Sequence, residues 1–167
     1  LSRDIPAGKP VPSSVVIDFP EGISATINET VNFRSLPYTS SSTVISSLQA
    51  SAKVTVLGYN TDVRTTGSYP YDHRWYRISV GGKIGWVYGK SLTIDNLLQI
   101  KGVTTTLNIR NAPDGNEVIG SAPANAFLKS VIIKGQPVSS NGWYNIYLLN
   151  STVTGWVSGD YINEIHN

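Results

Sequence analysis

The ionisable side chains are the natural place to look for catalysis, and here they form no recognisable catalytic set. A hydrolase needs a nucleophile or a metal-bound water, with acid and base groups within reach of it. The only two histidines are His73 and His166, and no His-x-His or His-Glu-x-x-His spacing occurs. Asp72 precedes His73, but the Gly-x-Ser-x-Gly turn that would present a serine to this pair is absent. The sequence therefore predicts that the chain is not an enzyme by itself.

Motifs for cofactors and metal ions are also absent. Gly89, Lys90 and Ser91 resemble the end of a phosphate-binding loop, but that motif needs a glycine five residues earlier, where Ile84 stands. No aspartate-rich calcium loop is present, and the chain contains no cysteine. We therefore expect no cofactor and no bound metal ion.

Charge and hydropathy argue against two classes of partner. The 13 Lys and Arg residues are scattered and the formal net charge is +2, so we expect no surface for nucleic acid. No apolar run reaches the roughly 20 residues that span a bilayer, so we expect no membrane insertion. The chain starts with leucine, contains no methionine and shows no apolar signal core near its start. We interpret it as a processed or excised piece of a larger protein.

A set of short motifs occurs twice in the same order. The matched pairs are VNFRSLP (31–37) with LNIRNAP (107–113), TVISSL with EVIGSA, KVTVLG with SVIIKG, RWYRISV with GWYNIYL, and GWV (85–87) with GWV (155–157). The offset between matched residues is not constant, so insertions separate the motifs. This pattern predicts two homologous modules in tandem and not a solenoid of fixed period.

Alternation within the motifs predicts short β-strands. Val31 and Phe33 share one face, whereas Arg34 takes the other. In WYRISV, the positions of Tyr76 and Ile78 are apolar and Trp75 lies opposite. The 15 glycines and nine prolines suit tight turns between such strands. We predict an all-β chain of two small barrels, with Trp86 and Trp156 capping them from outside the core.

The repeats define the expected domains. The first module covers residues 22–92 and the second covers 102–167. Residues 1–21 are expected to form an N-terminal extension, with a linker-like start to Ser14 and a strand-like VVIDF that adds an edge strand. The linker at 93–101 is apolar enough that we expect it to pack, for example as a single helical turn.

The order of these motifs resembles the bacterial Src-homology-3 (SH3) domain family. Its pattern is close to Leu-Asn-Val-Arg-x-x-Pro, then Trp-Tyr-x-Val, then Gly-Trp-Val-x-x-x-Tyr-Leu, and it appears here twice, outside the first 21 residues and the linker. The resemblance implies two tandem SH3-like β-barrels, as in the wall-targeting regions of endolysins, autolysins and other peptidoglycan hydrolases. It further implies an extracellular, non-catalytic chain that binds peptidoglycan or an associated wall glycan. The chain would hold a separate catalytic domain of the same protein near its substrate.

Aromatic residues are the expected ligand contacts, because flat rings stack on sugars or line a groove. The first module has the longer segment before its RWYRISV motif, so we expect the ligand groove there. Candidate contacts are three residues of that loop, one residue of the turn-like LPYTSSS, and the tryptophans on the face away from the core: Tyr69, Tyr71, Asp72, Tyr38, Trp75 and Trp143. For the two tryptophans, a purely structural role is the alternative.

An arginine occurs at the same place in the first strand motif of each module. Arg34 and Arg110 are expected to form structural hydrogen bonds to turns, and contact with an anionic wall polymer is the alternative.

Two other functions are alternatives to wall binding. The modules could pack on a catalytic domain of the same protein and shape its substrate cleft. They could also bind peptides as a protein-interaction module.

Overall fold

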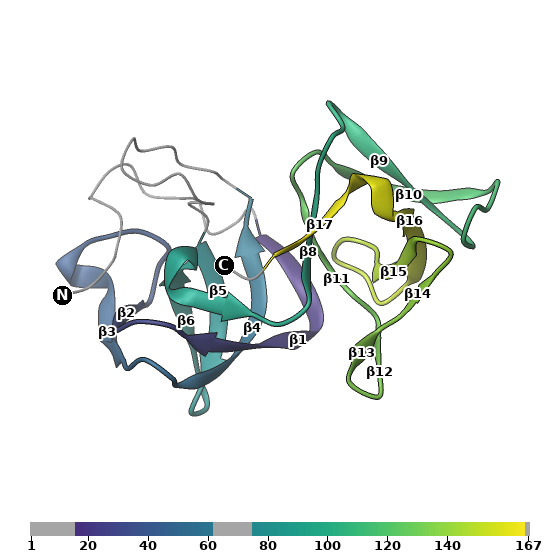
Figure 1. Cartoon of the computed structure of the whole chain (residues 1–167). Coiled ribbons are helices and arrows are strands. Elements are labelled where there is room, and N and C mark those ends of the chain that lie inside the picture. The colour runs from purple at the N-terminus through teal and green to yellow at the C-terminus, as the bar shows by residue number, and fades with distance from the viewer. Residues whose placement is uncertain (1–15, 62–74, 166–167) are drawn as a thin grey trace. The chain divides into compact units, whose positions relative to one another are not determined.

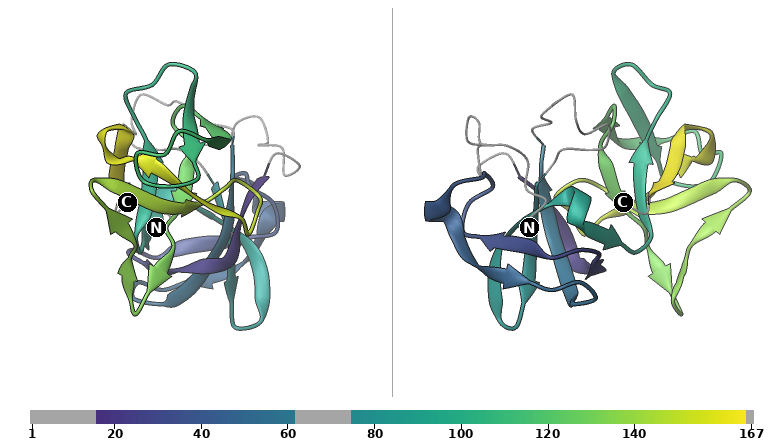
Figure 2. Two further views of the ribbon diagram at one scale, coloured as in Figure 1. Left: turned by 90° about the vertical axis from the view of Figure 1, so that its right-hand side faces the viewer. Right: turned by 60° about the vertical axis from the view of Figure 1, so that its left-hand side comes forward.

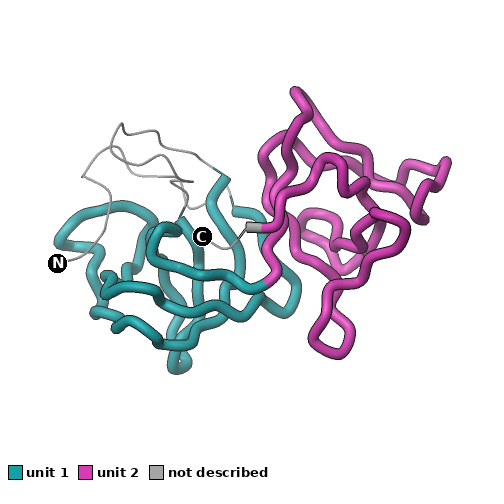
Figure 3. Tube along the Cα trace, viewed as in Figure 1, with its two compact units in different colours: residues 1–95, 167 teal, residues 96–166 magenta. Residues whose placement is uncertain are grey.

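The fold is seen in a computed structural model that describes residues 16–61 and 75–165. Strands dominate these residues, and the only helices are short 3-10 turns, which confirms the expected all-β class. The chain divides into two compact units, unit 1 (1–95, with residue 167) and unit 2 (96–166) (Figure 3). Within the described ranges, none of the helices has the length and apolarity needed to cross a membrane.

Unit 1 is built around one antiparallel sheet. Its elements in chain order are β1 (Val16–Ile27), β2 (Val31–Arg34), η1 (Ser41–Thr43), β3 (Val44–Leu48), β4 (Lys53–Asn60), β5 (Trp75–Val80), β6 (Lys83–Tyr88), η2 (Gly89–Ser91) and β7 (Leu92–Ile94). The strands pair in the order β3-β2-β6-β5-β4-β1-β7 (Figure 1). Residues 16–19 of the strand-like VVIDF segment form the start of β1, and Val16 to Asp18 pair with β4.

Unit 2 contains shorter strands in three small sheets. Its elements are β8 (Leu97–Ile100), β9 (Thr106–Arg110), β10 (Val118–Pro123), β11 (Phe127–Lys129), β12 (Ile132–Ile133), β13 (Gln136–Pro137), β14 (Ser139–Ser140), β15 (Trp143–Tyr147), β16 (Thr154–Ser158), η3 (Gly159–Tyr161) and β17 (Ile162–Ile165). The sheet orders are β10-β9-β16-β15-β14, β11-β8-β17 and β12-β13. The β12–β13 hairpin projects from the rest of this unit (Figures 1 and 2).

The predicted alternation determines which side chains form the two cores. In unit 1, Val31, Phe33 and Ile78 are buried, as the pattern predicts. In unit 2, the core includes Leu107 and Ile109 of β9, together with Ile146 of β15 and Val157 of β16. The side chains on the other face of these strands point away from the core, and they differ between the two units.

Strand register shows that the motifs repeat in three dimensions. Arg34 of β2 lies opposite Trp86 of β6, and Arg110 of β9 lies opposite Trp156 of β16. In both units a 3-10 turn then leads into a last strand, β7 or β17. That strand pairs with the strand that precedes the repeat, β1 or β8. Each repeat therefore includes one strand more than the sequence motifs indicated.

The extra strand of unit 2 corrects the conformation that was predicted for residues 93–101. They were expected to link the modules, for example as a helical turn, but residues 97–100 form β8, which pairs with β11 and β17. Leu97, Leu98 and Ile100 are buried, so the expectation that this segment packs is correct, although its conformation is extended. The apolar side chains are explained by a strand that has a neighbour on both sides.

One matched pair of motifs is out of register in the structure. Ala25 of β1 pairs with Val54, whereas Leu98 of β8, at the corresponding position, pairs with Leu128. The counterpart of KVTVLG therefore begins at Phe127 and not at Ser130. Much of SVIIKG belongs to the β12–β13 hairpin, where Ile132 and Ile133 are exposed. Similar apolar content produced the sequence match, although the backbone pairing differs.

Candidate functional site

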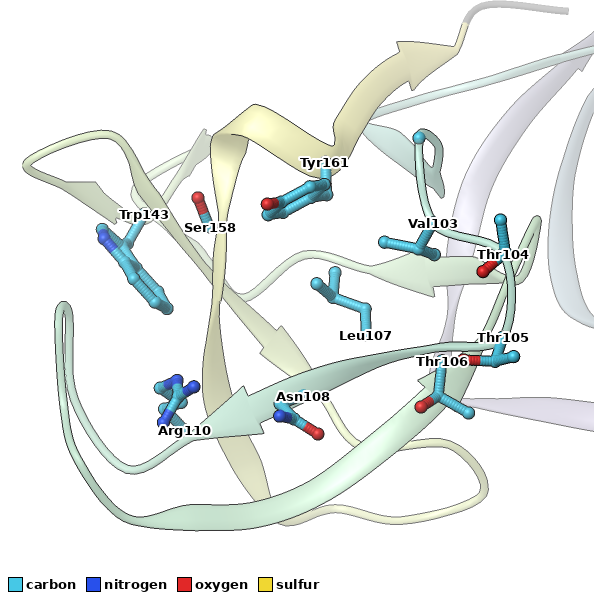
Figure 4. A pocket seen from close by; sticks show the side chains of 11 residues that line it. Val103, Thr104, Thr105, Thr106, Leu107, Asn108, Arg110, Trp143, Ser158 and Tyr161 are labelled. Carbon is cyan, nitrogen blue, oxygen red and sulfur yellow. The ribbon is translucent and has the colours of Figure 1, made fainter.

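A pocket of about 440 Å³ lies at one end of the outer face of the five-stranded sheet in unit 2 (Figure 4). Because Leu107, Ile109 and Val157 point into the core, their strand neighbours point to the other side of β9 and β16. The polar and aromatic side chains that line the pocket include Thr106, Asn108, Arg110, Trp143, Ser158 and Tyr161. Three strands and the η3 turn therefore supply one hollow with a cation, two aromatic rings and several hydroxyl groups.

Arg110 is the only ionised side chain among the described residues that line this pocket. It ends β9 and is half-buried, and its guanidinium has no hydrogen-bond partner within the described part of the protein. The described lining of the pocket contains no carboxylate. An arginine fork of this kind binds phosphate or carboxylate oxygens through paired hydrogen bonds, so the pocket can accept an anionic group.

Trp143 and Tyr161 provide the flat surfaces of the pocket. The Trp143 indole Nε1 donates a hydrogen bond of 3.0 Å to Oδ1 of Asp114, which fixes the orientation of the ring. Asp114 lies in the β9–β10 turn, where the Gly115 N–H donates to the Ala112 carbonyl at 2.9 Å. The Tyr161 side chain is 41% exposed, so a ligand can reach it.

The corresponding region of unit 1 is filled by protein groups. Tyr88 stands opposite Trp75, in the position that Ser158 takes opposite Trp143, and the Trp75 and Tyr88 ring centres are 5.7 Å apart. Ser91, the counterpart of Tyr161 at the end of the 3-10 turn, donates to Glu29 at 3.2 Å. Unit 2 therefore has an open pocket where the small residue Ser158 faces Trp143, whereas Tyr88 fills the same position in unit 1.

The two equivalent arginines have different roles in the two units. Arg34 is buried and donates to the Ser40 carbonyl at 2.8 Å and to the Thr43 hydroxyl at 2.9 Å, which confirms the structural role predicted for it. Burial also lowers the pKa of Arg34. Among residues 16–61 and 75–165, no hydrogen bond of this kind reaches Arg110, because the shorter β9–β10 turn brings no counterpart of η1 to it. The structural role predicted for Arg110 therefore stays a prediction.

The structure places the predicted ligand contacts in very different environments. Trp143 lines the pocket, and its contact with a ligand stays a prediction. Trp75 was expected on a solvent-facing surface, but it is fully buried in a cluster with Trp86 and Tyr88, with Val16 packed against it. The same cluster buries Trp86, which was expected to lie outside the core.

The remaining predicted contacts do not join this pocket. Tyr38 is half-buried in the turn after β2, where its carbonyl accepts from the Thr43 hydroxyl at 2.9 Å. Tyr69, Tyr71 and Asp72 lie outside the described residues. Ligand contact at these four residues stays a prediction.

Several pocket residues were missed by sequence reasoning. Ser158 and Tyr161 follow the second GWV motif, for which only a capping role of Trp156 was predicted. The signal that could have identified them is a difference between the copies, since Tyr88 and Ser91 occupy the matching positions. Across residues 16–61 and 75–165, no three His, Asp or Glu side chains gather as a metal ion would require.

Comparison with known proteins agrees with the division into two related domains. The bacterial SH3 domain family matches residues 29–93, and the GW (Gly-Tryp) dipeptide domain matches residues 104–163. No curated protein matches the chain.

Two solved structures are similar to the chain. The structure of NlpC2 from Trichomonas vaginalis has 16% identity and a TM-score of 0.35, and the match covers 86% of this chain and 48% of that one. For NlpC1 from the same organism the values are 17% identity, a TM-score of 0.31, and coverage of 86% and 46%. The chain thus spans less than half the length of either protein.

The family matches confirm the predicted family and correct one detail of it. The second copy is of the GW type, whereas the sequence motifs had suggested two copies of the same kind. The chain thus carries a bacterial SH3 domain at residues 29–93, followed by a GW (Gly-Tryp) dipeptide domain at residues 104–163.

Proposed function

We propose that this chain is a non-catalytic region that binds a polymer of the bacterial cell wall. In this role it holds a separate catalytic domain of the same protein, a peptidoglycan hydrolase, close to its substrate outside the cell. The role attributed to bacterial SH3 domains supports the proposal, because residues 29–93 match such a domain and residues 104–163 match the GW dipeptide domain.

The observation that carries the proposal is the pocket of unit 2. Among the residues that the structure describes, the Arg110 guanidinium has no hydrogen-bond partner and no carboxylate lines the pocket, while Trp143 and Tyr161 flank the same hollow. Wall polymers combine sugar rings with phosphate or carboxylate groups. The rings can stack on Trp143 and Tyr161, while the guanidinium of Arg110 binds the anionic group. Hydroxyl groups of the pocket add hydrogen bonds to the sugar.

Retention of the isolated chain on purified peptidoglycan sacculi, with and without wall teichoic acid, tests this proposal. We expect Arg110→Ala to weaken retention by about tenfold or more, because a hydrogen bond to a charged group contributes about 1.5–3 kcal/mol. Arg110→Lys should recover only part of the loss, since it keeps the charge but not the fork. Lys83→Ala is the matched control, because it removes an exposed positive charge from unit 1. Equal retention of Arg110→Ala and wild type would show that the pocket is not the binding site.

The same assay separates the proposal from its alternatives. Failure to bind sacculi, together with tight binding to an excised catalytic domain, would support a role in shaping that domain's substrate cleft. Selective binding to a partner peptide would support a protein-interaction module. Release of soluble muropeptides by the chain alone would overturn the non-enzymatic assignment.

A further inference from the structure

We infer that the chain forms a dimer in which strand β3 of unit 1 pairs with β3 of a second copy in antiparallel orientation. The two strands would join the seven-stranded sheets of the two copies edge to edge. This inference uses no residue of the unit 2 pocket and does not depend on the proposed function. It assigns a partner to a strand that the candidate site leaves unused.

Strand β3 (Val44–Leu48) lies at one edge of the sheet of unit 1 (Figure 1). It pairs with β2 on one side, and no strand within residues 16–61 and 75–165 pairs with its other side. In an antiparallel sheet, alternate residues of a strand direct both the backbone N–H and the C=O to the same neighbour. The outer side of β3 therefore offers donors and acceptors that one more strand can use.

Apolar side chains are exposed along this edge. Val44 is 41% exposed and Ile45 is 43% exposed, although both belong to a strand of the main sheet. Ile45 has no opposite residue on β2, because the register shifts between Phe33 and Arg34. Pairing with a second strand would remove these side chains from water, which favours association.

The absence of charge along this edge favours a second copy as the occupant. Residues 35–52 contain no Asp, Glu, Lys, Arg or His, so β3 and the segments on both sides of it are neutral. A strand that pairs with its own copy brings equivalent side chains together, and like charges there would repel each other. The neutral edge of β3 meets its copy without this repulsion.

The equivalent edge strand of unit 2 carries features that prevent such pairing. β10 lies at the edge of its sheet, as β3 does. Glu117 precedes β10, and its last residue is Pro123, which has no backbone N–H to donate. Charges and prolines are two of the means by which proteins protect exposed sheet edges. β3 has neither, so the edge available for pairing is that of unit 1.

An antiparallel pair centred on Ser46 matches the side chains of the two copies. Ser46 then lies opposite Ser46 of the second copy on the twofold axis, and Val44 lies opposite Leu48 of the second copy. Because directly opposite residues point to the same side of a sheet, each Val44 gains an apolar partner. A pair centred on Ser47 would instead place Leu48 opposite a serine.

Sedimentation equilibrium of the full chain from about 1 μM to 1 mM tests the inference, since an interface of one short strand pair is small. We expect a reversible dimer in this range. Ser46→Lys should raise its Kd by about tenfold or more, because the symmetry places two ammonium groups opposite each other. Val118→Lys is the matched control. It adds the same charge at an exposed position of β10 and should leave the dimer unchanged.

Two further measurements test the register. A mixture of Ser46→Lys and Ser46→Glu should dimerise again, because opposite charges then meet on the axis. Ser46→Cys should form an intermolecular disulfide on mild oxidation, since opposite Cα atoms lie about 4.5–5.5 Å apart, within the reach of a disulfide. The chain has no other cysteine. Ser140→Cys, which is exposed on the β14 edge of unit 2, is the control and should stay largely reduced.

The outcomes separate this inference from the proposed function. A wild-type chain that stays monomeric at about 1 mM would overturn the inference, as would a dimer that persists in Ser46→Lys or dissociates in Val118→Lys. Equal cross-linking of Ser46→Cys and Ser140→Cys would overturn the pairing of the two β3 strands. Retention of a monomeric chain on sacculi would leave the proposed function intact. A dimeric wild-type chain that sacculi do not retain would refute the proposed function alone.

Discussion

Closing the pocket of unit 2 with one side chain tests the comparison between the two units. Ser158 faces Trp143 across the β15–β16 pair, and in unit 1 Tyr88 faces Trp75 at the same position. We predict that Ser158→Tyr places a ring on Trp143 much as Tyr88 lies on Trp75, with ring centres 5.7 Å apart in that pair. The new ring would occupy the space beside Arg110 and block access to it.

The expected effects on stability and on binding have opposite signs. An aromatic pair of this geometry contributes about 0.5–1.5 kcal/mol beyond its buried area, which for a unit of this size is a rise of roughly 2–12 °C in Tm. Ser158 Oγ accepts from the Asp160 N–H at 3.4 Å, and this contact would be lost. Tyr88 starts η2 without any side-chain cap, so the 3-10 turn tolerates that loss. Retention on sacculi should fall by about tenfold or more, because the anion loses its charge-assisted hydrogen bonds to Arg110.

Calorimetric unfolding and the sacculus assay on the same preparations measure the two effects. Ser158→Ala is the control, since it removes the hydroxyl but keeps the pocket open, and it should bind nearly as well as wild type. Wild-type retention by a stable Ser158→Tyr chain would refute the assignment of the ligand to this pocket. A large loss of stability would refute the equivalence of Ser158 and Tyr88.

Three further measurements follow from the structure. Arg34→Ala should destabilise unit 1 by about 3 kcal/mol in denaturant unfolding, because it leaves buried acceptors without a donor. Arg110→Ala should change the free energy of unfolding by less than about 0.5 kcal/mol. Similar losses for the two variants would contradict the different roles of the two arginines. Gly85→Ala should destabilise unit 1 by more than about 1 kcal/mol, because the added Cβ atom would lie 2.6 Å from the Arg34 carbonyl oxygen. An unchanged Tm would show that β2 and β6 can move apart at this point. Burial, followed by the charge and hydrogen bond of Glu164, raises the pKa of Tyr144, so Glu164→Gln should lower that pKa in an ultraviolet titration of the phenolate. Because the pKa of Tyr144 is higher in the folded state, its contribution to the free energy of unfolding is present below a pH of about 10 and is lost as the pH rises through the folded-state pKa. Tyr144→Phe has no phenolic group, so it should not show this loss of stability at alkaline pH.

The strands and their repetition could be predicted from the sequence, because alternation is a property of neighbouring residues. Val31 and Phe33 were assigned to the core from their spacing alone, and the structure buries both. The order of the motifs was sufficient to indicate two homologous all-β modules. The apolar run at Leu97 and Leu98 showed that this segment packs, but not that β11 and β17 would hold it as a strand.

The candidate site depended on contacts between residues that are distant in the sequence. Arg34 and Arg110 occur in nearly the same motif, yet only Arg34 meets a turn that accepts its hydrogen bonds. Trp75 and Trp143 alternate in the same way, yet one is buried and the other lines a pocket. Alternation shows which side of a strand a residue takes, but tertiary structure decides what covers that side. The all-β class and the recurrence of the motifs were therefore determined by the sequence alone, whereas the packing of neighbouring strands and turns decided that the open pocket lies in unit 2.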